Sequence, residues 1–182
     1  MKWVALFSQS GSEIARLASN LGTCPDMTIT TNFNCDTWNE AIHLLPRVAI
    51  MKSNDIHSML ENRNERLLIT MHGYLRILPG SVCDKHLVFN GHPGDIIKYP
   101  QLKGKDPQKK AVELKLSSSG YVIHQATEEL DGGDIFRFAR VGLSPVSTEE
   151  DVCNLLRDTG VRLWTDFMTD VLWELRQTRG GI

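Results

Sequence analysis

Apolar residues in the first half of the chain come in short runs separated by segments with helical spacing. The run at 3–7 predicts a strand, and the segment 12–21, with Ile14, Leu17 and Ala18 on one face, predicts a helix. The same alternation continues as strands at 27–31, 47–51, 67–71 and 87–89, with helices at 37–45 and 53–60. The first half of the chain therefore reads as successive βαβ units.

The second half is less regular. A helix is predicted over 106–116, with Pro107 in its first turn, and the polar stretch 117–120 ends it. Strands are predicted at 121–126 and 135–141, followed by one long or broken amphipathic helix over 147–175, with the last five residues frayed. The direction of the two later strands is not set by the pattern.

This order predicts one α/β domain over residues 1–182, with a mostly parallel twisted sheet, helices on both faces and a long C-terminal helix. Ligands of such sheets bind at the carboxyl ends of the strands. The functional site is therefore expected in the loops that follow Phe7, Met71, Phe89 and Ala126.

Composition narrows the function classes. Hydrophobic residues make up 41% and charged residues 23%, as in an ordinary globular protein, and a net charge of -2 gives no reason to expect a nucleic-acid or membrane partner. The short apolar run at the N-terminus suits neither a signal peptide nor a membrane span, so a cytoplasmic location is expected. The four cysteines lack the paired spacing of zinc sites, and no metal is expected. Oligomeric state stays open.

Three side chains could meet in one pocket and carry chemistry. Asn90 and His92 follow a predicted strand, and Asp131 lies in a loop flanked by Gly132 and Gly133. His124 is seven residues before Asp131, so the loop could fold back and bring this pair together. Each motif alone also has a structural explanation, as local hydrogen bonding in a turn or as a polar hairpin tip.

Taken together, Asn90-x-His92-Pro93, Gly120 to His124 and Leu130-Asp131-x-Gly133 resemble the folate-dependent formyltransferase family, and within it the glycinamide ribonucleotide transformylases. The segment 73–78 and the first loop, 10–12, resemble the folate pocket and the phosphate-holding loop of that family. The resemblance covers nearly the whole chain. It implies a Rossmann-like formyltransferase fold.

The resemblance also implies an activity, namely transfer of a formyl group from the co-substrate 10-formyltetrahydrofolate, a reduced folate of one-carbon metabolism, to a small amine acceptor. The implied catalytic residues are Asn90, His92 and Asp131, supported by His124. The implied folate-binding residues are Leu75, Arg76, Ile77, Leu78, Glu128, Glu129, Leu130 and Asp131. The implied acceptor-binding residues are Gly11, Ser12, Glu13, Asn90 and Gly91.

These residue types suit the chemistry. Attack of an amine on a formyl carbon builds negative charge on oxygen, which the Asn90 amide and a cationic His92 could stabilise. Asp131 could hold His92, raise its pKa and help to move a proton from the amine to the departing folate nitrogen.

Some positions leave alternatives open. Glu13 stands where the glycinamide ribonucleotide transformylases have asparagine, and its carboxylate would repel a phosphate unless it turns outward. The lysines at 98, 103, 105, 109 and 110 could recognise an anionic acceptor or simply form a solvated face. A 10-formyltetrahydrofolate hydrolase and a noncatalytic ligand-binding module are the competing functions, and the sequence does not name the acceptor.

Overall fold

The protein, as a computed structural model that describes residues 1–177, contains one seven-stranded sheet with the strand order β3-β2-β1-β4-β5-β6-β7. The strands β1 to β5 are parallel to one another, whereas β6 runs antiparallel to β5 and β7 antiparallel to β6. The strands are β1 Lys2–Phe7, β2 Met27–Thr30, β3 Val48–Ile50, β4 Leu67–His72, β5 Leu87–His92, β6 Ser118–Gln125 and β7 Ile135–Gly142. The predicted α/β class and mostly parallel sheet are confirmed.

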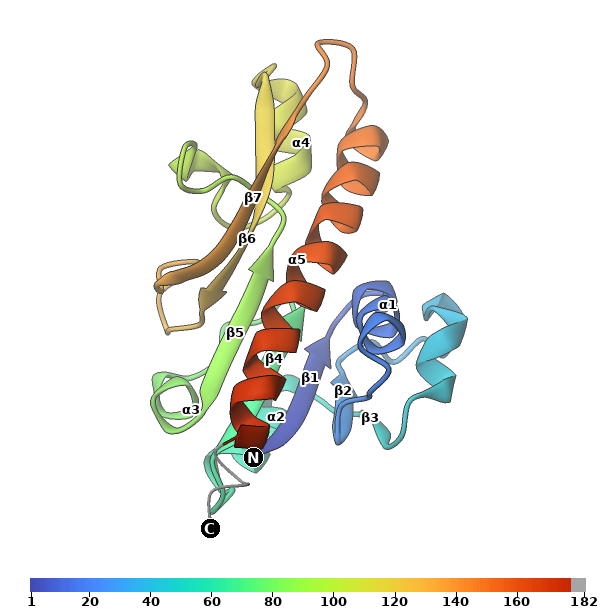
Figure 1. Cartoon of the computed structure of the whole chain (residues 1–182), viewed down its shortest axis with the longest axis vertical. Helices are drawn as coiled ribbons and strands as arrows, with labels where there is room; N and C mark the ends of the chain where they lie inside the picture. Colours follow the sequence, from blue (N-terminus) through green and yellow to red (C-terminus); the bar gives the residue numbers. More distant parts are fainter. Residues whose placement is uncertain (178–182) are drawn as a thin grey trace.

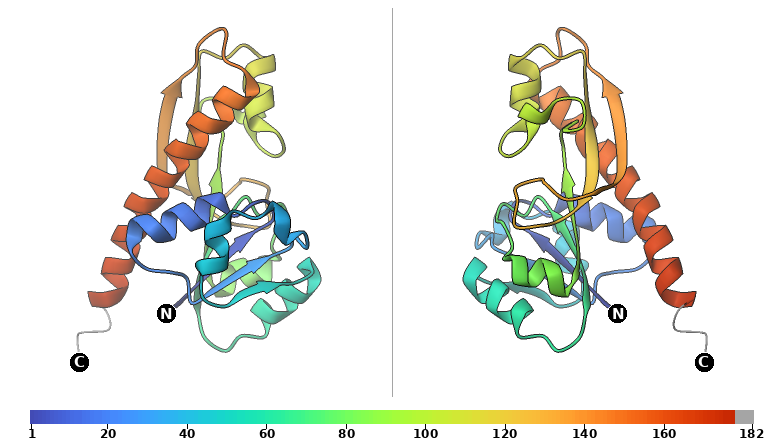
Figure 2. Two further views of the ribbon diagram at one scale, coloured as in Figure 1. Left: turned by 90° about the vertical axis from the view of Figure 1, so that its right-hand side faces the viewer. Right: turned by 90° about the vertical axis from the view of Figure 1, so that its left-hand side faces the viewer.

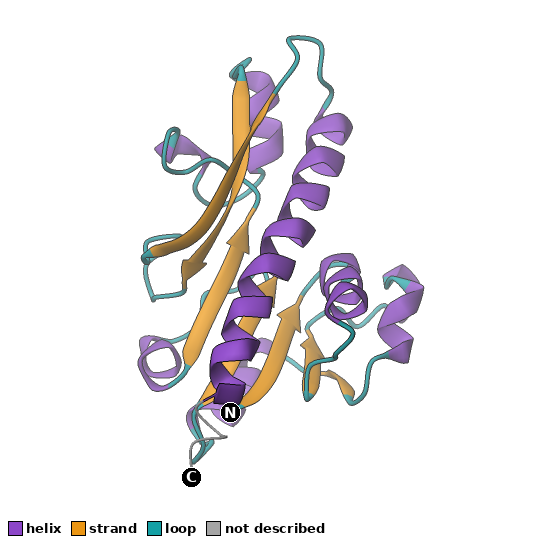
Figure 3. Cartoon of the chain, in the orientation of Figure 1, coloured by secondary structure: helices purple, strands orange, loops and turns teal. Residues whose placement is uncertain are grey.

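Helices cover both faces of the sheet (Figure 1; Figure 3). The helices α1 Ser12–Leu21 and α5 Glu149–Gln177 lie on one face, and α2 Ser53–Glu61 and α3 Gly80–Lys85 lie on the other. The short helix α4 Pro107–Glu113 packs near the first turns of α5. Figure 2 shows that α5 extends along most of the long dimension of the molecule. No helix among residues 1–177 is long and apolar enough to cross a membrane.

The core follows from the two-residue alternation of side chains along each strand. Ala5 and Phe7 of β1 pack toward α1 and α5, where Trp164 is fully buried. Val4 and Leu6 of the same strand pack toward α2 and α3. Because both faces are covered, β1 and β4 are buried nearly throughout, which explains the continuous apolar runs in their sequences.

The helix predicted over 37–45 is wrong. Two 3-10 helices, Cys35–Thr37 and Glu40–Leu44, occupy this region, and the side chains of Asn34 and Asn39 cap them. An asparagine side chain that accepts a backbone N–H two residues later favours a tight turn over a continuous α-helix.

Two strands are longer than the sequence predicts. Residues 90–92 continue β5 because both neighbouring strands pair with them: Asn90 lies opposite Met71 on one side and opposite His124 on the other. Residues 118–120 open β6 by pairing with 140–142 of β7. At Gly120, a Cβ atom would stand 2.6 Å from the carbonyl oxygen of Ala139, so only glycine lets the two strands approach this closely.

Two other differences concern helices. The sequence analysis missed α3, which is only six residues long. The C-terminal helix begins at Glu149, because the Thr148 hydroxyl accepts the Asp151 N–H at 3.1 Å and the Asp151 carboxylate accepts the Thr148 N–H at 2.8 Å. It then continues without a break through Gln177. The fraying predicted for residues 178–182 lies outside the described residues.

Candidate active site

The predicted site residues meet where β5 and β6 end. Asn90 and His124 are direct partners across the antiparallel β5–β6 pair, and the Asn90 Nδ2 lies 3.1 Å from the His124 Nε2. His92 lies two residues beyond Asn90 on the same strand, so its side chain leaves the same face of the sheet. Sheet pairing alone therefore brings three of the four candidate side chains together.

Asp131 completes the group, because its carboxylate contacts the other three side chains. Oδ1 accepts a hydrogen bond from the Asn90 Nδ2 at 3.4 Å and lies 3.4 Å from the His124 Nε2. Oδ2 lies 3.3 Å from the His92 Nδ1 and accepts the backbone N–H of Gly104 at 2.8 Å. We call Asn90, His92, His124 and Asp131 the carboxylate cluster. The return of the 126–134 loop that the sequence suggested is present.

The backbone explains the Asp131-x-Gly133 pattern. Asp131 has a φ of 47°, a left-handed conformation that aspartate tolerates better than most residues. At Gly133, a Cβ atom would lie only 1.9 Å from the carbonyl oxygen of Gln125. This glycine lets the loop return along β6, where the Gln125 N–H donates to the Asp134 carbonyl at 2.8 Å.

Both ring nitrogens of His92 are held. Nε2 lies 2.9 Å from the carbonyl oxygen of Leu102, which can only accept, so this nitrogen carries a hydrogen. Nδ1 faces Asp131. The ring packs against Gly94, where a Cβ atom would stand 2.8 Å from Nε2. His92 thus has one fixed position between a carboxylate and a carbonyl.

Burial and charge act in opposite directions on this pair. Burial lowers the pKa of His92, and the Asp131 carboxylate and the Leu102 carbonyl raise it only in part. Asp131 thus raises the pKa of His92 as expected, but burial outweighs this effect and the net pKa is lowered. Burial alone would raise the pKa of Asp131, but the hydrogen bond with His124, the charge of His92 and the Gly104 N–H together lower it from 3.8 to about 2.

The low pKa of Asp131 makes a prediction about acid stability. Its folded-state pKa, about 2, lies below the unfolded value of 3.8, so the ionised carboxylate stabilises the fold above pH 4, and this contribution is lost as the pH falls through about 2. Asp131→Asn removes it. Urea unfolding from pH 4 to pH 2 should show the stability difference between the two proteins narrowing. A constant difference would contradict the assignment.

The residues proposed to bind folate are divided by the structure. Leu75 and Ile77 are 54% and 52% exposed, and Arg76 is exposed beside them, whereas Leu78 is 1% exposed and belongs to the core under α2 and α3. The loop carrying Glu128, Glu129 and the exposed Leu130 lies beside this segment, since a Cβ at Gly80 would meet the Glu128 carboxylate at 2.8 Å. Only the exposed residues of this set are therefore accessible to a ligand, and Leu78 packs in the core beneath them.

The first loop also differs from the expectation. Gly11 has a φ of 72° and fits closely under Ile42, and Ser12 donates its N–H to the Ser10 hydroxyl at 3.4 Å. Glu13 does not turn outward. Its Oε1 lies 2.8 Å from the His72 Nδ1, and its Oε2 accepts the Tyr121 hydroxyl at 2.6 Å.

A second group of polar side chains lies behind β5, and of its members only Glu13 was a candidate from the sequence. Thr70, His72, Glu13, Tyr121 and Trp164 form a hydrogen-bonded chain on the face that α1 and α5 cover. The sequence did offer one signal for this group. His72 ends the buried strand β4, and the loop after Met71 was already expected to contribute to the site. Gly91 lies between the two groups and is buried.

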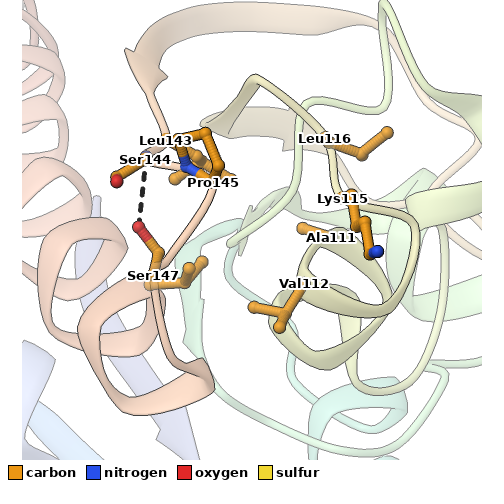
Figure 4. A pocket seen from close by; sticks show the side chains of 9 residues that line it. Ala111, Val112, Lys115, Leu116, Leu143, Ser144, Pro145 and Ser147 are labelled. Atoms are coloured by element: carbon orange, nitrogen blue, oxygen red, sulfur yellow. Dashed lines mark hydrogen bonds between the residues drawn. The ribbon is translucent and has the colours of Figure 1, made fainter.

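Two cavities lie elsewhere. One, of about 30 Å³ and thus large enough for roughly one water molecule, lies between α4 and the loop from β7 to α5 (Figure 4). The other, of about 200 Å³, lies beside Trp3 and Asp26 near the end of α5. Neither is lined by a predicted site residue. Among residues 1–177, no group of three or more His, Cys, Asp or Glu side chains is arranged to hold a metal ion.

Comparison with known proteins now identifies the family. Residues 47–167, more than half of the chain, match the family described as Formyl transferase. The chain belongs to the formyl transferase family. The matched region contains the whole carboxylate cluster, and it excludes the first loop and Glu13.

Individual relatives agree with this family. Phosphoribosylglycinamide formyltransferase of Haemophilus influenzae is 31% identical over 87 residues, which cover 47% of this chain and 40% of that protein. The solved phosphoribosylglycinamide formyltransferase of Streptococcus pneumoniae superposes with a TM-score of 0.78 at 17% identity, covering 94% of this chain and 99% of that one. A formyltetrahydrofolate deformylase from Pseudomonas syringae superposes with a TM-score of 0.71 at 20% identity, covering 91% and 59%. The structural matches establish the formyltransferase fold.

Proposed function

We propose that this protein transfers a formyl group from 10-formyltetrahydrofolate to the amine of a small acceptor. The observation that carries the proposal is the convergence of Asn90, His92 and His124 on the two oxygens of Asp131. Membership of the formyl transferase family and the names of its relatives support the reaction class.

Asn90 is the residue proposed to stabilise the transition state. Its amide donates to Asp131 over a long 3.4 Å contact, which a developing oxyanion on the formyl group can replace at little cost. His124 keeps the amide group in this orientation. Its Nδ1 lies 2.9 Å from the Gln125 carbonyl and so carries a hydrogen, while its Nε2 lies 3.1 Å from the Asn90 Nδ2 and 3.4 Å from the Asp131 Oδ1.

Asp131 and His92 are proposed to move the proton. Attack of the amine forms a C–N bond and leaves a surplus proton on the attacking nitrogen. Asp131 accepts this proton and passes it to the neutral His92, whose Nδ1 lies 3.3 Å away. The resulting imidazolium is held between the carboxylate and the Leu102 carbonyl. The proton returns to the folate nitrogen as the C–N bond to folate breaks, and the products are a formylated amine and tetrahydrofolate.

The exposed part of the 75–77 segment and the neighbouring loop around Leu130 are proposed to hold the folate. Leu75, Ile77 and Leu130 present apolar side chains that suit the flat face of a pterin ring. Asp131 follows Leu130 directly, so a ring bound on this loop would place the formyl group near the carboxylate cluster.

A single incubation separates this function from hydrolysis. The purified protein is mixed with 10-formyltetrahydrofolate, with and without a pool of small amines, and mass spectrometry follows formate and formylated amines. We expect one amine to gain a formyl group in step with tetrahydrofolate release, and we expect Asp131→Asn to abolish the signal. Equal formate production with and without amines would instead assign a hydrolase, the activity named for the Pseudomonas syringae protein that shares this fold.

A further inference from the structure

The strongest feature outside the carboxylate cluster is the inward-turned Glu13. Its side chain is 15% exposed although it stands in the first turn of α1, and its partner His72 has no exposed side-chain surface. An ordinary first-turn glutamate points to solvent, where it favours the helix dipole at little desolvation cost. Turning inward must therefore be stabilised by specific partners.

Those partners all direct hydrogen atoms toward the carboxylate. The indole of Trp3 can only donate, and it donates to the Thr70 Oγ1 at 2.8 Å, while this oxygen also lies 2.9 Å from the His72 Nε2. The other ring nitrogen of His72 donates to Glu13 at 2.8 Å, because an ionised carboxylate can only accept. The chain therefore ends on the carboxylate.

The second oxygen of Glu13 receives a donor from the opposite side. Tyr121 donates its hydroxyl hydrogen to the carboxylate, and the Trp164 indole donates to the Tyr121 oxygen at 3.2 Å. Tyr121 is confined, since a Cβ at Gly91 or at Gly160 would stand within 2.3 Å of it. The Glu13 carboxylate is therefore the acceptor at which both hydrogen-bonded chains end.

The strand residues that hold this carboxylate are neighbours of the proposed reaction centre. His72 is the β4 partner of Gly91, which separates Asn90 from His92, and Tyr121 precedes the residue that pairs with His92. Glu13 also stands at the start of α1, where the backbone N–H groups of a helix would otherwise attract an anion. The carboxylate occupies that positive end with a negative charge of the protein itself.

We infer that Glu13 determines acceptor specificity: the acceptor is an amine without a phosphate group, and the part that faces α1 is uncharged or cationic. The inference rests on the proposed function and goes beyond it by naming the substrate class. It sets the protein apart from relatives whose name specifies a phosphoribosyl substrate. A fixed carboxylate excludes a phosphate by repulsion, which is specificity against the wrong ligand.

The test compares two probes that differ only in the phosphate: phosphoribosylglycinamide and the same molecule after dephosphorylation. Calorimetry measures the Kd of each probe in the presence of tetrahydrofolate. We expect the wild-type protein to bind the dephosphorylated probe about 10-fold or more tightly. Glu13→Gln, which removes the charge and keeps the size, should bring the two Kd values within about 3-fold, mainly by tightening the phosphorylated probe.

Glu150→Gln is the matched control, because Glu150 is also a first-turn helix glutamate but is exposed on α5. It should leave the ratio unchanged. Equal Kd values in the wild type, a preference for the phosphorylated probe, or no measurable binding of either probe would overturn the inference. If Glu13→Gln proves unstable, the ratio of the two Kd values in the wild-type protein still tests the inference. The proposed function is tested separately: it fails if no formylated amine forms in the mass-spectrometric assay.

Discussion

Asp131→Asn is expected to lower kcat/KM for formyl transfer by about 100-fold or more, while the protein stays folded. Asp131 is the one side chain that contacts all three other members of the carboxylate cluster. An asparagine cannot accept the proton of the attacking amine, and its NH₂ group would face either His92 or the pair formed by Asn90 and His124. Steady-state kinetics with 10-formyltetrahydrofolate and the identified amine measure the effect.

Asparagine is the informative replacement because the backbone at Asp131 is left-handed, with a φ of 47°. Asparagine adopts this conformation readily, whereas alanine would add strain to the loss of charge. Asp106→Asn is the matched control, since Asp106 has a φ of 55°, is exposed and makes no side-chain cap. We expect this control to keep at least about half of the wild-type rate. A near-normal rate for Asp131→Asn would refute the catalytic assignment.

The parallel half of the fold was predictable because its signals are local. β1 and β4 are buried on both faces, so they appear in the sequence as unbroken apolar runs. The helix predicted over 12–21 has the same bounds in the structure, where Gly11 and Gly22 flank it in left-handed conformations. In these segments, hydrophobic periodicity and glycine position indicate the same element.

The strand predictions fail where partners distant in sequence decide the conformation. Residues 90–92 and 118–120 contain glycine and polar side chains and look like loops, yet both are strands because neighbouring strands supply their hydrogen bonds. The antiparallel direction of β6 and β7 likewise follows from long-range pairing. Local composition carries no record of such partners.

The candidate site shows the same division. Asn90, His92, His124 and Asp131 were found from the sequence because a family pattern connects them, and the structure places them in contact. Their catalytic roles stay predictions. The inward turn of Glu13 could not be predicted, since it depends on the positions of His72 and Tyr121, which lie 59 and 108 residues away in the chain.

The carboxylate cluster and the polar group around Glu13 lie on opposite faces of β5 and are separated there by the backbone of Gly91. Asn90 and His92 extend to one face of β5, and Tyr121 and Trp164 press on the other face at the residue between them. Gly91 has no side chain, so the Tyr121 hydroxyl can lie directly against the backbone there. The positions of Asn90 and His92 and the burial of Glu13 therefore both depend on the absence of a side chain at Gly91.

Gly91→Ala is accordingly expected to destabilise the fold by about 3 kcal/mol. The new Cβ would stand 2.2 Å from the Tyr121 hydroxyl oxygen and 2.5 Å from the Trp164 Nε1. Neither neighbour can retreat easily, because Tyr121 is also packed against Gly160 and Trp164 is fully buried. Urea unfolding at pH 7 measures the change in the free energy of unfolding.

The cost is steric rather than conformational, since Gly91 is not among the glycines with positive φ and alanine fits its extended backbone. Gly142→Ala is the matched control: Gly142 ends β7, also lacks a positive φ, and has no atom within 4 Å of the position of a Cβ. Its stability should stay within about 0.5 kcal/mol of the wild type. Equal effects of the two substitutions would show that Tyr121 and Trp164 do not press on Gly91, and the support proposed for Asn90 and His92 from behind the sheet would then be absent.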